Sequence, residues 1–237
     1  MRFDTTNWSL ILQAREGRAT PAREALASLC ASYWPPVYAF IRRRGRAPAD
    51  AEDLTQSYFA RFFEKGYVGA FRPEAGRFRT FLLASVTHFL ANEWDREQAL
   101  KRGGGKRHLS LDAASAEERL RLEPVDTLTP EAIFERQWTA ALLARCLERL
   151  RAEQAASGAR ARFERLKSFL TGEGAPGDYA TLAPELGLSE STVRVAVHRL
   201  RRRFAEVLRD EVRGTLADPS GVDAEIGWML ETLRSGK

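Results

Sequence analysis

The spacing of three residues near the C-terminal end constrains the fold of this chain most. Within residues 178–213, Ala183, Gly187 and Val193 stand where two helices joined by a tight turn need such residues. The small side chain lets the helices approach, the glycine adopts a left-handed backbone in the turn, and the valine packs the second helix on the first. The expected shared core consists of Leu182, Leu186, Leu188 and Val197. The segment therefore predicts a helix-turn-helix.

The second helix of this motif carries groups suited to duplex DNA. Ser189 is a suitable N-cap, and the N-terminal end of such a helix enters the major groove. Arginines reach phosphates or read guanine edges. The candidate contacts are Ser191, Thr192, Arg194, His198, Arg199, Arg201, Arg202 and Arg203. The alternative is an ordinary helical corner with a solvated basic face.

The rest of the chain also has the helical period, and no convincing strand pattern occurs. We expect helices over residues 3–15 and 21–34, the second ended by Pro35-Pro36, and a third from Val37 to Arg44. A fourth is expected to be capped by Asp50 and to stop at Gly66. The longest pattern covers residues 78–101, with an apolar stripe of Phe78, Phe81, Leu82, Ser85, Val86 and Phe89. The predicted fold class is all-α.

Glycines, prolines and charge mark the domain limits. The run of residues 101–107 breaks the long helix, and residues 104–129 look like a flexible linker with little packed core. We therefore expect a helical domain at 1–103 and a helix-turn-helix domain at 130–213. Residues 214–237 form a C-terminal extension with an amphipathic helix, whose apolar stripe is Val222, Ile226, Met229, Leu230 and Leu233.

Composition narrows the class of protein. The 237 residues are 44% hydrophobic, which suits one or two globular domains, and the net charge of +5 is compatible with a nucleic-acid partner. Cys30 and Cys146 lie in apolar helical patterns and indicate reduced core residues of a cytosolic protein. No run is apolar enough to span a bilayer, and no signal peptide is evident.

No motif supports catalysis or a cofactor. Asp50, Glu52 and Asp53 cluster at a helix start, but no histidine or further carboxylate lies at ligand spacing, so we expect no metal. Helix-dipole complementarity or docking of a basic partner explains the cluster better. His88, His108 and His198 also lack ligand-spaced partners.

The end of the long helix suits single-stranded DNA. Residues 96–107 hold the cations Arg96, Lys101, Arg102, Lys106 and Arg107 against one acid, Glu97. Trp94 and Tyr67 are near, and bases stack on such rings while cations bind phosphates. For these two aromatic residues a core position is an equally open alternative.

Four stretches together resemble bacterial RNA polymerase sigma factors of the compact extracytoplasmic-function type. They are the segments 33–42 (YWPPVYAFIR), 50–59 (DAEDLTQSYF), 78–82 (FRTFL) and 189–203. The resemblance covers about residues 20–110 and 130–213. In that family the second stretch docks on the polymerase clamp, the third opens the promoter-melting helix, and the fourth reads the upstream promoter element.

The resemblance implies a cytoplasmic, non-enzymatic protein that binds core RNA polymerase and promoter DNA, both duplex and single-stranded. An anti-sigma factor or another regulator is a further expected partner. The implied polymerase contacts are Asp50, Asp53, Leu54, Gln56 and Phe59. The implied contacts to the downstream element and for melting are Arg79, Thr80, His88, Asn92, Trp94 and Arg96.

The chain departs from the family pattern in three places. His88 stands where many members have asparagine, the linker is long, and residues 214–237 extend past the helix-turn-helix. The main alternative is a polymerase-independent helix-turn-helix regulator with an N-terminal sensor or dimerisation domain. The second alternative is an enzyme acting on nucleic acid, but the sequence shows no set of carboxylates or histidines that could form its catalytic site.

Overall fold

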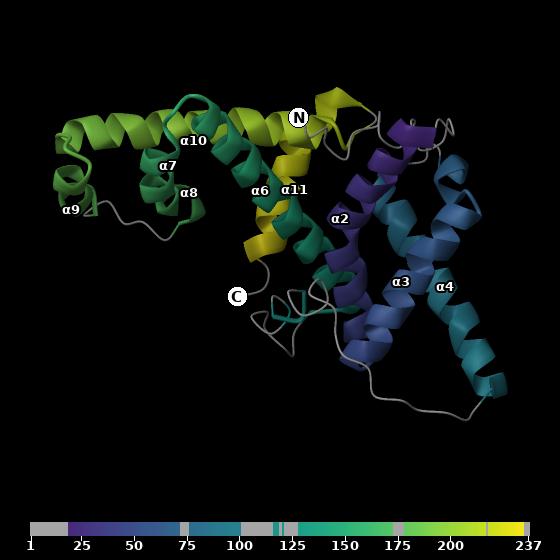
Figure 1. Ribbon diagram of the computed structural model, residues 1–237. Helices are drawn as coiled ribbons and strands as arrows, with labels where there is room; N and C mark the ends of the chain where they lie inside the picture. The colour runs from purple at the N-terminus through teal and green to yellow at the C-terminus, as the bar shows by residue number, and fades with distance from the viewer. Residues whose placement is uncertain are drawn as a thin grey trace. The chain divides into compact units, whose positions relative to one another are not determined.

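The computed structural model describes residues 19–71, 76–100, 116–118, 120, 128–172, 178–216 and 218–234. Every regular element in these ranges is an α-helix or a short 3-10 helix, so the all-α prediction is confirmed for this part of the chain (Figure 1). The helix predicted at 3–15 and the basic run 101–107 lie outside the described residues.

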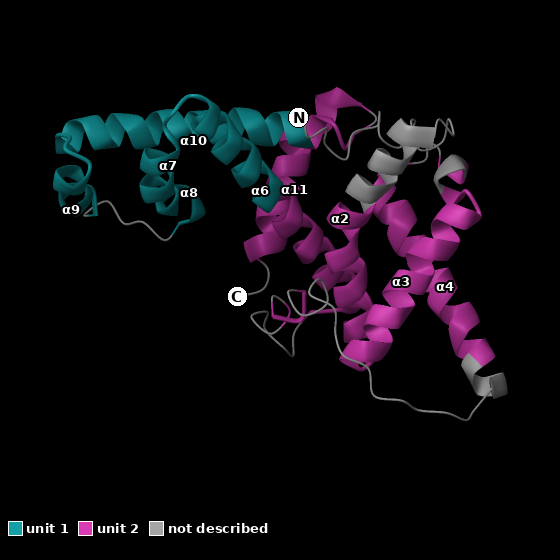
Figure 2. Ribbon diagram, viewed as in Figure 1, with its two compact units in different colours: residues 1, 143–211 teal, residues 2–142, 212–237 magenta. Residues whose placement is uncertain are grey.

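Two compact units divide the chain (Figure 2). The C-terminal unit comprises residues 143–211, and the N-terminal unit combines residues 2–142 with 212–237. These limits differ from the predicted domains, because residues 130–142 and the C-terminal extension belong to the N-terminal unit.

Helix α2 (Ala19–Arg43) continues through Pro35 and Pro36, so the predicted break at these prolines is wrong. A proline inside a helix removes a backbone hydrogen bond and costs roughly 3 kcal/mol. Around the prolines, however, α2 buries a dense apolar face consisting of Tyr33, Val37, Tyr38, Ala39, Phe40 and Ile41. Each large side chain contributes about 1.5–3 kcal/mol on burial, which offsets the loss.

Helix α3 (Pro48–Glu64) begins earlier than predicted. Its N-cap is Ala47, followed by Pro48, whose missing N–H is harmless in the first turn. Asp50 lies in that first turn and is not the cap, so the predicted capping role is wrong. Gly66, with a φ of +62°, follows the helix, as predicted for the stop.

Aromatic side chains form the core between α3 and α4 (Phe78–Leu100). The ring of Tyr58 contacts Phe59, Phe62 and Phe89, with centroid distances of 5.2, 5.6 and 5.5 Å. The 3-10 helix η1 (Tyr67–Ala70) follows α3, and Tyr67 meets Phe62 at 6.1 Å. Most of the stripe predicted for α4 is buried; Phe81 and Ser85 are half-buried.

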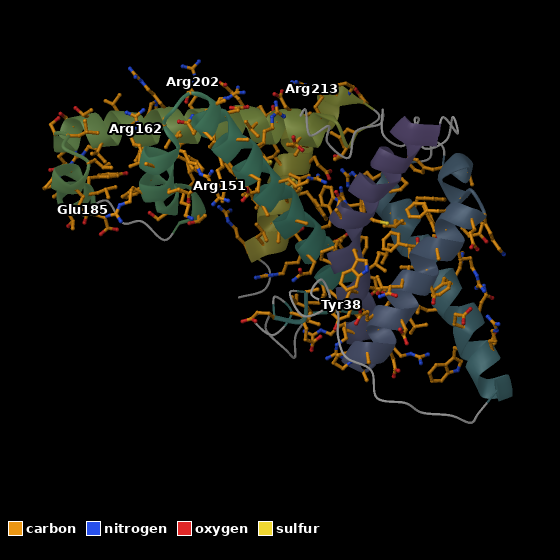
Figure 3. All side chains as sticks on the ribbon, viewed as in Figure 1. Tyr38, Arg151, Arg162, Glu185, Arg202 and Arg213 are labelled. Atoms are coloured by element: carbon orange, nitrogen blue, oxygen red, sulfur yellow. The ribbon has the colours of Figure 1, made fainter. Side chains whose placement is uncertain are left out.

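Part of the predicted linker is packed. Ala116 and Glu117 are buried in the N-terminal unit, which corrects the expectation of a linker with little packed core for these residues. The Glu117 carboxylate accepts hydrogen bonds from Tyr38, labelled in Figure 3, and from Arg42, each at 2.8 Å. Burial beside this carboxylate raises the pKa of Tyr38 above its usual range.

Helix α6 (Pro130–Ala156) begins at residue 130, the predicted start of the second domain, and the Thr129 hydroxyl accepts a hydrogen bond from the Ala132 N–H. Its buried stripe includes Ile133, Phe134, Trp138, Leu142, Cys146 and Leu150. Burial raises the pKa of the Cys146 thiol to about 12 and that of Cys30 to about 11, and both cysteines are free. These thiols therefore stay protonated, as expected for unreactive packing residues.

The extension forms η3 (Pro219–Gly221) and α11 (Val222–Arg234). Val222 and Met229 are buried as predicted, whereas Leu230 is 47% exposed. The fully buried position of this helix is the acid Glu225. The predicted apolar stripe is therefore correct for only part of its members.

The C-terminal unit contains α7 (Arg160–Leu166), α8 (Ser168–Thr171) and α9 (Asp178–Glu185), with most of α10 (Glu190–Arg213). Its buried core is Leu150, Phe163, Leu166, Phe169, Ala183, Val193, Val197 and Leu200. Leu182, Leu186 and Leu188 pack against this core, as predicted.

Candidate nucleic-acid and polymerase interfaces

A tight turn joins α9 to α10. Gly187 has a φ of +63°, and the Leu188 N–H donates to the Ala183 carbonyl at 3.0 Å. Ala183 is 6% exposed and Val193 fully buried, so the three residues take the positions predicted from their spacing. Only glycine adopts this left-handed conformation without strain.

The start of α10 is fixed by hydroxyl groups. The Thr192 N–H donates to the Ser189 hydroxyl at 3.2 Å, as predicted for an N-cap. The same oxygen lies 2.9 Å from the Ser191 hydroxyl and 2.8 Å from that of Thr192. Ser191 and Thr192 are exposed, so they are available to a ligand at this end of the helix.

One side of α10 is buried and the other is basic. Val193, Val197 and Leu200 face the core, which leaves Arg194 and its neighbours on the exposed side. The Arg194 guanidinium pairs with Glu190 at 2.5 Å and lies 5.8 Å from the Tyr179 ring. His198 and Arg199 are exposed and have no side-chain partner within the described residues.

Two of the predicted DNA contacts instead bind protein groups. Arg201 donates from Nε and Nη2 to the Phe169 carbonyl, at 3.2 and 3.1 Å. Arg203 pairs with Glu153 at 2.8 Å and with Glu206 at 3.0 Å. Because these bonds tie α10 to its neighbours, both arginines serve the packing of the unit. Among the described residues, Arg202 (labelled in Figure 3) pairs only within its own helix, with Glu206 at 3.4 Å, and its side chain is 79% exposed.

Sequence reasoning missed Val195 on the same basic side. Its side chain is 49% exposed, although most large aliphatic residues of the unit are buried. It lies three residues before His198 and four before Arg199, so these side chains are neighbours on the helix. The buried series 193, 197 and 200 could have revealed it, because that series leaves position 195 outside the core.

The polar side of α4 forms a second candidate interface. His88, Asn92 and Arg96 follow each other at intervals of four and are all exposed, and Thr80 continues this side two turns earlier. Trp94 is 55% exposed, and the Arg46 guanidinium lies 5.3 Å from its ring. Trp94 is therefore a surface residue, and the alternative of a core position is wrong for it. Tyr67, at 38%, is also exposed.

The acidic side of α3 forms a third candidate interface. Asp50 and Gln56 are exposed, and Asp53 is half-exposed. The Gln56 amide donates to the carboxylate of Glu52 at 3.1 Å, which holds the Gln56 side chain along the helix.

These surfaces can be compared with known proteins. Residues 29–99 match the family model described as Sigma-70 region 2. Residues 29–99, called the region 2 domain below, are therefore similar to this family. No curated protein and no solved structure matched the chain. Region 2 domains belong to sigma factors, which are not enzymes and which bind core RNA polymerase and recognise promoters at transcription initiation.

The region 2 domain therefore contains the α3 and α4 surfaces, whereas α10 lies outside the matched residues. Within it, three predicted contacts need correction. Leu54 and Phe59 are 9% and 5% exposed, so they are core residues and offer no surface to polymerase. Arg79 is 4% exposed and pairs with Glu225, so it does not present its guanidinium to DNA in this structure.

Among the residues that the structure describes, no group of three histidines, cysteines or carboxylates could hold a metal ion. Over the same residues, no helix has a stretch long and apolar enough to cross a bilayer.

Proposed function

We propose that this protein is a sigma factor of the extracytoplasmic-function type, acting in the cytoplasm where it recruits core RNA polymerase to its promoters. The region 2 match supports binding of polymerase and promoter. The observation that carries the narrower proposal lies outside the match. It is a capped helix with exposed Arg194, His198 and Arg199, following a tight turn in a separate compact unit.

In this proposal, α3 docks on the polymerase. Its exposed Asp50, Asp53 and Gln56 form an acidic, hydrogen-bonding side that suits a basic partner surface. The opposite side of α3 is used by the aromatic core, including Tyr58 and Phe62. Substitution of the polar side should therefore affect binding without opening a cavity.

The exposed side of α4 would take the unpaired strand of the downstream element. Trp94 offers a ring on which a base can stack, and Asn92 and His88 offer hydrogen bonds to base edges. Arg46 and Arg96 place positive charge beside these groups. Arg79 is excluded from this set as long as it remains buried.

The α9–α10 segment would act as a helix-turn-helix that reads the upstream element as duplex. Arg194 is closest to the start of α10 and can reach base edges, and Val195 offers an apolar contact for a thymine methyl group. Arg199 and Arg202 would bind phosphates, since they lie further along the helix. Arg201 and Arg203 would only position this surface.

A polymerase-independent regulator is the alternative function. It uses the same helix-turn-helix, but it gives no role to the exposed acidic side of a region 2 domain. Transcription in vitro with core polymerase, with and without the protein, on a library of promoters separates the two. Protein-dependent transcripts from a shared promoter sequence support the sigma factor. Duplex binding without any new transcript, and no co-elution with core polymerase, would favour the regulator.

A further inference from the structure

A buried arginine joins the start of α4 to the C-terminal helix within the N-terminal unit. The Arg79 guanidinium pairs with the Glu225 carboxylate, and both side chains are almost fully buried, at 4% and 0% exposed. Its Cζ atom lies 3.8 Å from the ring centroid of Trp228 and 4.6 Å from that of Trp138. Arg77, which is 45% exposed, pairs with the other oxygen of Glu225 at 2.8 Å.

This burial is incompletely compensated. The Nε atom of Arg79 has no hydrogen-bond partner within the described part of the chain. Desolvation lowers the pKa of Arg79, although the bond to Glu225 acts in the opposite direction. Removing a guanidinium from water is costly, and the ion pair and ring contacts offset only part of that cost. A ligand that binds Arg79 better than α11 does can therefore displace α11 from it.

The two groups that α11 presents resemble the phosphate and the base of a nucleotide in their chemistry. Glu225 and Trp228 lie three residues apart on one side of the helix, as a carboxylate and an aromatic ring. The carboxylate meets two arginines as a phosphate would, and the indole lies against a guanidinium as a base would. Without α11, Arg77, Arg79 and the ring of Trp138 would form a site with cations and a stacking surface.

We infer that α11 is an intramolecular competitor of single-stranded DNA, which masks Arg77, Arg79 and Trp138 until the DNA strand displaces it. This inference rests on the proposed single-stranded DNA contact of the region 2 domain. It adds a second DNA contact at the start of α4, which is available only when α11 is displaced. With α11 in place, DNA meets only the exposed side of α4 around Trp94. With α11 displaced, the strand extends over the start of α4.

Binding of a fluorescein-labelled single-stranded DNA of mixed sequence to the full chain tests this inference. Glu225→Gln keeps the shape of the side chain and removes the competing charge, and we expect about tenfold tighter binding because the open state becomes populated. The matched control is Glu231→Gln, which makes the same charge change at an exposed position of α11. Its affinity for the DNA should equal that of the wild type, apart from the small increase that removal of any negative charge from the protein causes.

The gain in DNA affinity of Glu225→Gln should depend on Arg79. The double variant Arg79→Gln/Glu225→Gln, which replaces the ion pair by two neutral amides, should lose it and return to the affinity of the wild type. A second measurement needs no variant: backbone amides of residues 222–234 should exchange hydrogen faster when the DNA is added to the wild-type chain, because α11 is displaced.

The outcomes separate this inference from the proposed function. Equal affinity of Glu225→Gln and Glu231→Gln, or an exchange rate of α11 that saturating DNA leaves unchanged, overturns the competitor role. If binding is then still lost in Trp94→Ala, the proposed DNA contact stands without it. If no form of the chain binds single-stranded DNA, alone or with core polymerase, the proposed contact fails and the inference fails with it.

Discussion

At the scale of single residues, the arginines of α10 divide into two groups that the sequence could not separate. Arg194, Arg199 and Arg202 are exposed and, among the described residues, make no hydrogen bond or ion pair outside α10, whereas Arg201, which is also exposed, and Arg203 bind the Phe169 carbonyl and Glu153. These partners lie in α8 and α6, 32 and 50 residues away along the chain, respectively. Periodicity identifies the face of a helix but not such distant partners, so the sequence assigned all of these arginines to DNA.

The exposed group leads to a first prediction, on sequence preference. Arg194→Ala should change the preferred upstream sequence, because a lost bidentate base contact costs about 1–3 kcal/mol at one position. Arg202→Ala should weaken all duplexes alike and lower the salt dependence, as expected for a phosphate contact. Selection of a randomised duplex by the full chain at two salt concentrations measures both. An unchanged preferred sequence in Arg194→Ala would show that another side of α10 reads the bases.

The second prediction concerns two glycines with opposite backbone conformations. Gly187→Ala should destabilise the protein by about 1–2 kcal/mol, because alanine is strained at a φ of +63° even where its methyl group has space. Gly227→Ala is the matched control: Gly227 lies inside α11, a Cβ there meets nothing within 4 Å, and the change should stabilise by roughly 0.5–1 kcal/mol. Thermal unfolding monitored by circular dichroism compares them. A stable Gly187→Ala variant would argue against the tight turn.

At the scale of the elements, the sequence predicted most helices and some of their ends correctly. The start of α10 follows from Ser189, because capping is a local interaction. The continuity of α2 through Pro35-Pro36 was missed, because the buried face that offsets the prolines is formed with other parts of the unit. Arg79 was placed on the polar side of α4, since its counter-charge Glu225 lies 146 residues away.

The third prediction belongs to helix α3. Asp53→Lys combined with Gln56→Ala should abolish co-elution with core polymerase, because it reverses the charge and removes the amide of the proposed docking side. The unfolding midpoint should change little, since Gln56 is exposed and Asp53 half-exposed. Glu64→Lys, an exposed charge reversal at the other end of the same helix, is the control and should still bind. Continued co-elution of the double variant would contradict the assignment of this side.

At the scale of the whole molecule, the boundaries of the compact units bear on how function is divided along the chain. The N-terminal unit includes the matched region 2 domain, the first half of α6 and the C-terminal extension. A fragment of residues 130–213 would therefore cut through the N-terminal unit and expose Phe134 and Trp138, which are buried. Tests of upstream recognition should for this reason use the full chain.

The final prediction concerns melting, which requires polymerase, promoter and region 2 domain together. Asn92→Ala with Trp94→Ala should impair open-complex formation on a duplex promoter, because the unpaired strand loses a hydrogen-bonding group and a stacking surface worth about 1–3 kcal/mol per base. A template with a preformed bubble should restore part of the activity, since the cost of unpairing the strands has been removed. Both side chains are exposed, so folding and polymerase co-elution should be unchanged. Permanganate reactivity of unpaired thymines measures the open complex. An equal loss on duplex and bubble templates, with co-elution intact, would place these residues outside the melting step and leave them a role only after the strands have separated.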